Sequence, residues 1–287
     1  MNRFYGFAGV EIGISMPEER FFENEYRMEA FRLERAEDPH WFHVSFTEEL
    51  PEPEGQLLAC TPTFRVYSQE GSQVRYIGPC QEDWQKANIR VDHRGKAHQI
   101  LLKNSAYPGR VGTKTLLEGI AAEHLIARNR GVVFHCSFIN RGGKAILFTA
   151  PSETGKSTQA DLWQKYRGTE IVNGDRAAIR LADGVLLAEG IPFAGSSQYC
   201  KNQSLPLGAI VYLAQAPHTT IRRMRGYEAF SRIWEGISIN TWDKQDLELA
   251  SDTVKRIAES VPVFHMPCTP DEAAVIALEQ ALAQQEG

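Results

Sequence analysis

Hydrophobic residues in the first hundred positions fall into short runs that are separated by turn-forming residues. The runs are rich in β-branched and aromatic residues, which is typical of strands. We predict an antiparallel, β-rich segment over residues 1–110, closed by the turn at Tyr107-Pro108-Gly109. The strands predicted in this segment cover residues 4–14, 41–46, 63–67, 74–77 and 97–102.

The pattern changes after residue 110. Residues 113–128 place apolar side chains at helical spacing, and two apolar runs at 131–139 and 144–149 then flank a turn at 140–143. The rest of the chain contains both helix-like and strand-like patterns of apolar residues, which predicts a mixed α/β domain over residues 111–287. Further strands are predicted at 170–172, 177–181, 185–188 and 207–213, and helices from about 156 and at 227–237, 247–260 and 270–283.

Composition and charge narrow the class of protein. With 287 residues, 43% of them hydrophobic, the chain can bury the core of one large domain or two modest ones. A net charge of -5 does not attract the negatively charged surface of a nucleic acid or of an anionic membrane. Neither is therefore predicted as a partner. The N-terminus lacks the apolar core of a signal peptide, and no run approaches the ~18 apolar residues of a membrane span. These features predict a cytoplasmic protein whose five scattered cysteines are reduced.

The candidate chemistry centres on residues 150–158, called the phosphate loop below, which read Ala-Pro-Ser-Glu-Thr-Gly-Lys-Ser-Thr. They fit the Walker A pattern G-x-x-x-x-G-K-[ST], with Ala150 in place of the first glycine. The loop lies where a predicted strand leads into a helix, so backbone N–H groups and the helix N-terminus can surround phosphates. The residues predicted to bind the nucleotide are Ser152, Glu153, Thr154, Gly155, Lys156, Ser157 and Thr158.

Two residues of the loop are predicted to act on the phosphates and the metal. Lys156 supplies a positive charge for the β- and γ-phosphates, and as an exposed loop lysine it is expected to contribute little to stability. The hydroxyl of Ser157 is a suitable ligand for Mg²⁺. ATP and Mg²⁺ are therefore the predicted cofactors. The alternative is a surface loop that only happens to contain a lysine.

Asp175 is the candidate for the carboxylate that completes a metal site. It follows the predicted strand 170–172 and lies nineteen residues after Lys156, which is the length of one crossover helix and the return to an adjacent strand. Asn173-Gly174-Asp175 is also a good turn sequence, so a turn residue without a catalytic role is the alternative.

His135 lies in the predicted strand before the phosphate loop, between apolar neighbours. A histidine in such a run is more often a packing side chain than a catalyst, so the residues alone favour packing.

The run 131–180 resembles the catalytic domain of HPr kinase/phosphorylase and its broader relatives, which share a core with phosphoenolpyruvate carboxykinase. The resemblance depends on His135, the strand 145–149, the phosphate loop and Asp175-Arg176. A wider run, which includes residues 191–197 and 206–215, looks like a group of uncharacterised bacterial HPr-kinase-like proteins. The N-terminal segment looks like an accessory part of that group.

The resemblance implies a mixed-sheet P-loop kinase core that transfers phosphate from ATP to a hydroxyl. A serine of a protein or peptide is one candidate acceptor, and a small molecule is another. By resemblance, Lys156 binds the phosphates, while Ser157 and Asp175 hold the metal. Related kinases often assemble, which leaves a homo-oligomer open.

One departure from the resembling family concerns the general base. HPr kinases carry two adjacent aspartates at the end of this strand, and the first is their base, but Gly174 occupies that place here. His135 is the substitute candidate, so the predicted catalytic residues are His135, Lys156 and Asp175. Two other functions stay open: a nucleotide-binding ATPase or switch module without an acceptor, and a degenerate kinase that serves as a binding protein.

Overall fold

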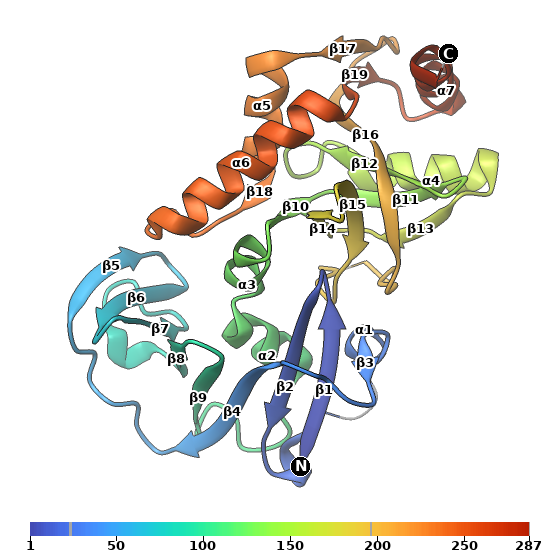
Figure 1. Cartoon of the computed structure of the whole chain (residues 1–287). Coiled ribbons are helices and arrows are strands. Elements are labelled where there is room, and N and C mark those ends of the chain that lie inside the picture. Colours follow the sequence, from blue (N-terminus) through green and yellow to red (C-terminus); the bar gives the residue numbers. More distant parts are fainter. Residues whose placement is uncertain (23–24, 196, 287) are drawn as a thin grey trace. The chain divides into compact units, whose positions relative to one another are not determined.

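The computed structural model describes residues 1–22, 25–195 and 197–286. The chain divides into two compact units, Met1–Ala122 and Glu123–Gly287, which are treated separately below (Figure 1). Each unit contains one large mixed sheet. None of the five cysteines, all of which lie in the described ranges, forms a disulfide. Among the helices described, none is both long and apolar enough to cross a membrane.

The first unit is built on a nine-stranded sheet with the strand order β3-β1-β2-β4-β9-β8-β7-β6-β5. Its strands are β1 (Asn2–Phe7), β2 (Val10–Ser15), β3 (Arg32–Leu33), β4 (His40–Thr47), β5 (Gln56–Cys60), β6 (Phe64–Gln69), β7 (Ser72–Ile77), β8 (Ile89–Arg94) and β9 (Ala97–Lys103). Its helices are α1 (Tyr26–Glu29) and α2 (Thr113–Ile120), with two short 3-10 turns at Glu18–Arg20 and Trp84–Lys86.

Two sequence predictions for this unit are wrong in part. The sheet is mixed, because β4 pairs in parallel with both β2 and β9. Long connections before and after β4 allow this, since parallel neighbours need a crossover that a tight hairpin cannot provide. The predicted strand 4–14 is a hairpin instead, because Ala8 and Gly9 turn the chain with positive φ angles of 50° and 68°.

The second unit has a ten-stranded sheet with the order β13-β11-β12-β16-β15-β14-β10-β18, and β19 adds to β16 and pairs with β17. Its strands are β10 (Gly131–His135), β11 (Ser137–Arg141), β12 (Lys144–Thr149), β13 (Glu170–Asn173), β14 (Arg176–Ala182), β15 (Val185–Gly190), β16 (Ser204–Gln215), β17 (Arg222–Met224), β18 (Ile237–Ser238) and β19 (Val263–Cys268). Its helices are α3 (Ala122–Arg128), α4 (Lys156–Arg167), α5 (Gly226–Glu235), α6 (Lys244–Ser260) and α7 (Glu272–Glu286).

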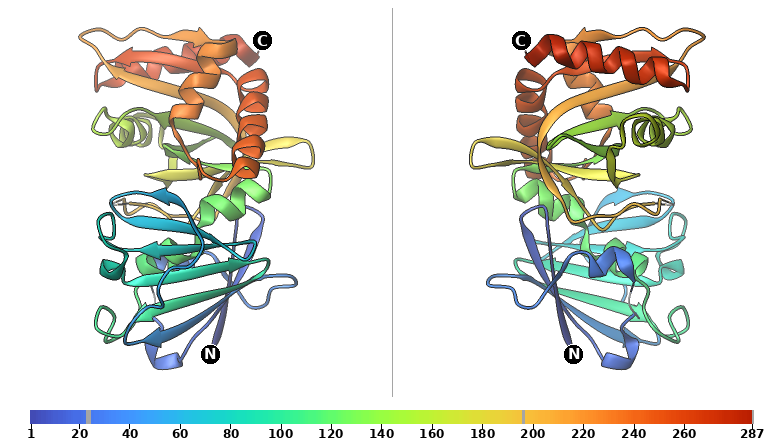
Figure 2. Two further views of the ribbon diagram at one scale, coloured as in Figure 1. Left: turned by 90° about the vertical axis from the view of Figure 1, so that its left-hand side faces the viewer. Right: turned by 90° about the vertical axis from the view of Figure 1, so that its right-hand side faces the viewer.

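β16 is the longest strand of this sheet and holds its two halves together (Figures 1 and 2). Its first residues pair antiparallel with β15, and its later residues pair in parallel with β12 and β19. Both faces of this central region are covered. Ile146 and Phe148 of β12 pack in the cluster that includes α4 and α7, whereas Leu147 packs in the cluster that includes α5 and α6. This double coverage explains why the strands read as continuous apolar runs.

The structure divides two of the predicted elements of this region. The predicted helix 113–128 is two helices, because Ala121 takes a left-handed conformation with φ 53° between α2 and α3. The predicted strand 131–139 is split at Cys136 into β10 and β11, which pair with different neighbours. The return after α4 also differs from the expectation: β13 is not adjacent to β12, because β11 lies between them.

Candidate functional site

The phosphate loop connects β12 to α4. Gly155 and Glu153 have positive φ angles of 114° and 63°. Ala150 does not have a positive φ, so an alanine fits where the Walker A pattern has its first glycine. Gly155 is the N-cap of α4 and offers no side chain to the N–H groups of the first turn. Those donors and the positive end of the helix suit an anion.

The structure places Lys156 differently from the expectation of an exposed side chain. Lys156 is only 9% exposed, and its Nζ donates to the carbonyl oxygens of Ala150 at 3.1 Å and Pro151 at 3.3 Å. Burial lowers its pKa, although the negative charge of Asp175 acts in the opposite direction. The ammonium group therefore lies inside the phosphate loop, held by carbonyl groups that a phosphate oxygen could replace.

Asp175 lies between β13 and β14, and each of its carboxylate oxygens lies near a nitrogen of a neighbouring side chain. Oδ1 lies 3.5 Å from Nε2 of His135, and Oδ2 lies 3.3 Å from Nε of Arg176. The hydrogen bond with His135 and the charge of Arg176 hold the pKa of Asp175 below its usual value, against the effect of burial. Asp175 is therefore ionised near neutral pH, which is the form that binds Mg²⁺.

The turn that carries Asp175 is fixed by Asn173, which is fully buried and which the sequence indicated only as part of a turn. The Oδ1 of Asn173 accepts hydrogen bonds from the backbone N–H groups of Asp175 at 2.9 Å and Arg176 at 3.0 Å. Its Nδ2 donates to the carbonyls of Ile191 at 3.0 Å and Phe193 at 3.1 Å. Asn173 is thus a positioning residue for Asp175. An asparagine two residues before an aspartate is the signal in the sequence, since it favours an Asx turn.

The Ser197 side chain occupies the space beside Gly174. A Cβ at this position would lie 2.1 Å from Oγ of Ser197. Ser137, which is fully buried, also donates to the carbonyl of Gly174 at 3.2 Å. The run 191–197 therefore folds against this turn, although its residue Ser196 lies outside the described residues. The space that an acidic base would need is filled by the Ser197 side chain.

His135 ends β10, and its backbone is held on both sides. Its N–H donates to the carbonyl of Gly236 at 2.8 Å, and its own carbonyl accepts from Oγ1 of Thr149 at 2.9 Å. The side chain is 38% exposed, so it is not enclosed in the core as the residues alone suggested. It lines two cavities, one with Asp175 and a smaller one of ≈ 150 Å³ with Tyr212 and Arg232.

The predicted site residues divide between two sides of the phosphate loop. Ser152, Glu153, Lys156 and Ser157 line one cavity of ≈ 420 Å³ together with His135 and Asp175. Thr154, Gly155 and Thr158 instead line a cavity of ≈ 370 Å³ on the other side, where Glu153 also contributes. The larger cavity therefore combines hydroxyl, carboxylate, ammonium and imidazole groups, and such groups can bind a hard cation and an anion.

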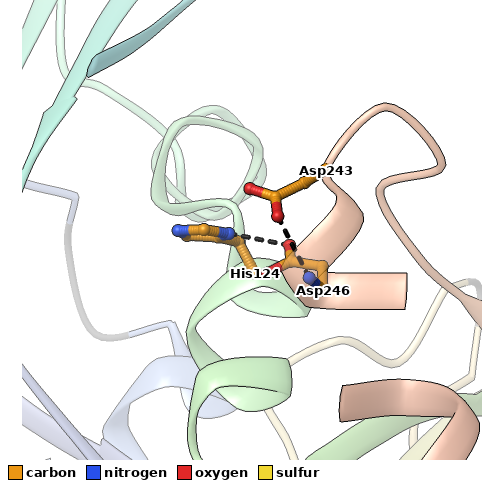
Figure 3. A group of neighbouring side chains, drawn as sticks. All are labelled: His124, Asp243 and Asp246. Atoms are coloured by element: carbon orange, nitrogen blue, oxygen red, sulfur yellow. Dashed lines mark hydrogen bonds and ion pairs between the residues drawn. The ribbon is translucent and has the colours of Figure 1, made fainter. Parts of the chain in front are cut away.

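A second group of titratable side chains, His124, Asp243 and Asp246, has ligand atoms within 4.8 Å of one another (Figure 3). Asp246 is fully buried and accepts from Nε of Arg128 at 2.9 Å, while Asp243 accepts from Nη2 of Arg128 at 3.1 Å. Nδ1 of His124 lies 2.8 Å from Asp246. Because the Arg128 guanidinium donates to both carboxylates, this group is an ion-pair network between α3 and α6.

Comparison with known proteins gives matches among solved structures. No protein-family model and no curated protein matches the chain. The chain is similar to the Hpr(Ser) kinase/phosphatase from Coxiella burnetii, with a TM-score of 0.34 and 14% sequence identity over 54% of this chain and 93% of that chain. A similarity this low carries no argument about activity, so the proposal below depends on the geometry of the site.

Proposed function

We propose that this chain is an ATP- and Mg²⁺-dependent kinase that transfers a phosphoryl group to a hydroxyl acceptor. The observation that supports it is the convergence of Lys156, Ser157, Asp175 and His135 on one cavity of ≈ 420 Å³. These residues come from α4, from the turn after β13 and from the end of β10. Residues this far apart in sequence are brought together by the sheet, at the end of the strand that leads into a glycine-containing loop.

The donor set fits ATP and Mg²⁺. The N-terminus of α4 and the turns of the phosphate loop offer backbone donors to phosphate oxygens. The Ser157 hydroxyl and the Asp175 carboxylate would hold Mg²⁺, because hard cations prefer oxygen ligands. A metal bound there would neutralise negative charge that develops on the transferred group. Arg176, which is 41% exposed, pairs with the same carboxylate only weakly and can give way.

Lys156 binds the phosphates by exchanging one set of oxygens for another. Its Nζ leaves the carbonyls of Ala150 and Pro151 and donates to phosphate oxygens that carry a full negative charge. Because the side chain is buried, this interaction is screened little by water.

His135 removes the proton from the acceptor hydroxyl. Its Nε2 faces Asp175, so a proton on Nε2 leaves the lone pair on Nδ1 as the proton acceptor. Asp175 orients the ring and stabilises the imidazolium that forms, as a carboxylate does for a histidine base in other enzymes. This role replaces the aspartate that Gly174 lacks.

The test of the proposed function is acceptor-dependent release of ADP. The purified chain is mixed with ATP and Mg²⁺, with and without serine-containing peptides or small hydroxyl compounds, and ADP is measured. Release that rises only with an acceptor supports a kinase. Release without an acceptor would instead indicate an ATPase or switch module, and the absence of nucleotide binding would indicate a degenerate kinase that acts as a binding protein.

A substitution of Asp175 tests whether this residue binds Mg²⁺. Asp175→Asn keeps the shape of the side chain and loses the charge that holds Mg²⁺, so turnover should fall and its Mg²⁺ dependence should weaken while ATP still binds. Asp252→Asn, which removes one charge at an exposed position of α6, is the control. A wild-type Mg²⁺ profile in Asp175→Asn would reduce Asp175 to a turn residue.

A further inference from the structure

A cavity of ≈ 570 Å³ lies where β17, the first half of α5 and the end of α6 meet (Figure 1). We name it the α5 cavity. It is lined by residues 223–227, by Phe230 and by four residues from 255 to 261. It shares no lining residue with the cavities around the phosphate loop. Its volume is within the ~300–1,000 Å³ that binding sites occupy, so the second unit offers a binding surface that phosphoryl transfer does not use.

The floor of the α5 cavity is apolar and belongs to the core of the unit. Met224 and Val261 are buried, and Phe230 and Ala258 are partly buried. All four pack in the hydrophobic cluster that includes α5 and α6, so the floor is held in place by the core. Tyr227, which also lines the cavity, is 85% exposed and leaves an aromatic ring in water. Floor and ring together suit an apolar side chain of a partner.

The charged residues of the α5 cavity leave an excess of positive charge. Three cations line it (Arg223, Arg225 and Lys255) against the single carboxylate of Glu259, in a chain whose net charge is -5. All three cationic side chains are exposed. Within the part of the chain that the structure describes, Arg225 and Lys255 form no ion pair, and Arg223 donates to the neutral amide of Gln285. These charges are therefore free to attract carboxylates of a partner.

Helix α5 connects the α5 cavity to the catalytic one. It begins at Gly226, which lines the α5 cavity, and ends at Glu235. The carbonyl of the next residue, Gly236, accepts from the N–H of His135 at 2.8 Å. Ten helical residues span about 15 Å. A polypeptide bound at the α5 cavity therefore needs about five extended residues, at ~3.3 Å each, to bring a hydroxyl to His135.

We propose that the α5 cavity docks an acidic segment of the polypeptide that accepts the phosphoryl group. One apolar side chain of that segment lies on the floor next to Tyr227, and its carboxylates face Arg223, Arg225 and Lys255. This inference rests on the proposed function, because it identifies the acceptor as a peptide or protein with a docking segment. A nucleic acid fits less well, since it has no apolar side chain for the floor and its phosphates would be repelled by Glu259.

The first test measures binding without nucleotide, by fluorescence anisotropy of a labelled peptide in which acidic residues surround one phenylalanine. The wild-type chain should bind it, and more weakly at high salt. Lys255→Glu replaces attraction by repulsion and should weaken binding about tenfold. Arg256→Glu makes the same change at the next, exposed position of α6, which does not line the cavity, and should weaken binding less than about threefold. Tyr227→Ala should weaken it about tenfold.

The second test measures turnover with two serine peptides. One carries the acidic segment about five to eight residues from the serine, and the other lacks the segment. Because docking holds the substrate and the transition state equally, the longer peptide should have a KM about tenfold lower with an unchanged kcat. In Lys255→Glu this advantage should be lost, while the short peptide should react as it does with the wild type.

The outcomes separate this inference from the proposed function. Absence of probe binding, binding that survives both Lys255→Glu and Tyr227→Ala, or equal KM values for the two serine peptides would overturn the docking site even where ADP release shows a kinase. Displacement of the probe by oligothymidylate as readily as by unlabelled peptide would also overturn it in favour of nucleic acid. If the probe binds and depends on Lys255 but no acceptor stimulates ADP release, the proposed function is wrong, and the assignment of the docked segment to a phosphate acceptor falls with it.

Discussion

At the scale of single residues, Lys156 is a buried side chain that carries a positive charge. Replacing it tests whether the charge serves ATP binding or the stability of the fold. Lys156→Met keeps the aliphatic part of the side chain and removes the ammonium, so packing survives while the phosphates lose their nearest positive charge. We expect ATP binding to be lost in calorimetry and the melting temperature to change little. Lys165→Met, at an exposed position of the same helix, should bind ATP normally. Normal ATP affinity and turnover in a folded Lys156→Met would remove the proposed phosphate site.

The second residue-scale prediction concerns His135. His135→Gln should lower turnover by about 10²-fold or more, because the lone pair that accepts the hydroxyl proton is lost. The affinity for ATP should be nearly unchanged. Since the side chain is 38% exposed, the melting temperature should also remain close to wild type. His218→Gln, at an exposed histidine, is the control. A destabilised variant with normal turnover per folded molecule would show that His135 is a packing residue and that the base lies elsewhere.

At the scale of elements, the turn between β13 and β14 depends on Asn173. Asn173→Ala leaves two backbone N–H groups and two carbonyls without their partner in a buried position, so we expect it to lower the free energy of unfolding by about 2–4 kcal/mol. Turnover should fall further than the folded fraction does, because Asp175 loses its position. Denaturant titration and turnover on the same sample measure both. Asn202→Ala, at an exposed asparagine, should change neither.

From the contact between α3 and α6 we predict how the stability of the protein depends on pH. Burial alone would raise the pKa of Asp246, but hydrogen bonds from His124 and Asn240, with Arg128, outweigh it and leave the pKa below its usual value. A carboxyl whose pKa is lowered by folding contributes stability above its unfolded pKa of about 3.9 and loses it as the pH falls through the folded value. Asp246→Asn should therefore be less stable than wild type near neutral pH.

The difference in the free energy of unfolding between the two proteins should shrink as the pH falls from about 5 to about 2. Carboxyl groups outside this network titrate equally in both proteins, so the comparison reports on Asp246 together with its neighbours Asp243 and His124. A difference that stays constant over this range would mean that the lowered pKa contributes no stability.

At the scale of the whole molecule, most strands and helices could be predicted from the sequence, because their periodicity is local. The pairing of strands could not. Nothing near β4 shows that its neighbours run parallel to it, since that depends on connections dozens of residues long. Single residues also divided elements that periodicity joins: Ala121 breaks a predicted helix, and Cys136 separates β10 from β11. Burial of both strands makes their sequences read as one apolar run.

The candidate site was predictable where a motif carries it and unpredictable where tertiary contacts do. The spacing of the phosphate loop is a local signal, and the structure places it between β12 and α4. The burial of Lys156 was missed, because its carbonyl partners are set by the path of the loop.

The shared strand β16 has a consequence for how this unit opens. One half of the sheet carries the phosphate loop after β12, and the other half carries Asp175 and His135 next to β14 and β10, and both halves are hydrogen-bonded through β16. Neither half can lose its ladder without disturbing the other, so they should open as one cooperative unit. In hydrogen exchange followed by mass spectrometry, amides of β16 should be the last to exchange, long after those of the terminal strand β13. Early exchange of one half of β16 would show instead that each half of the site can melt while the other stays folded.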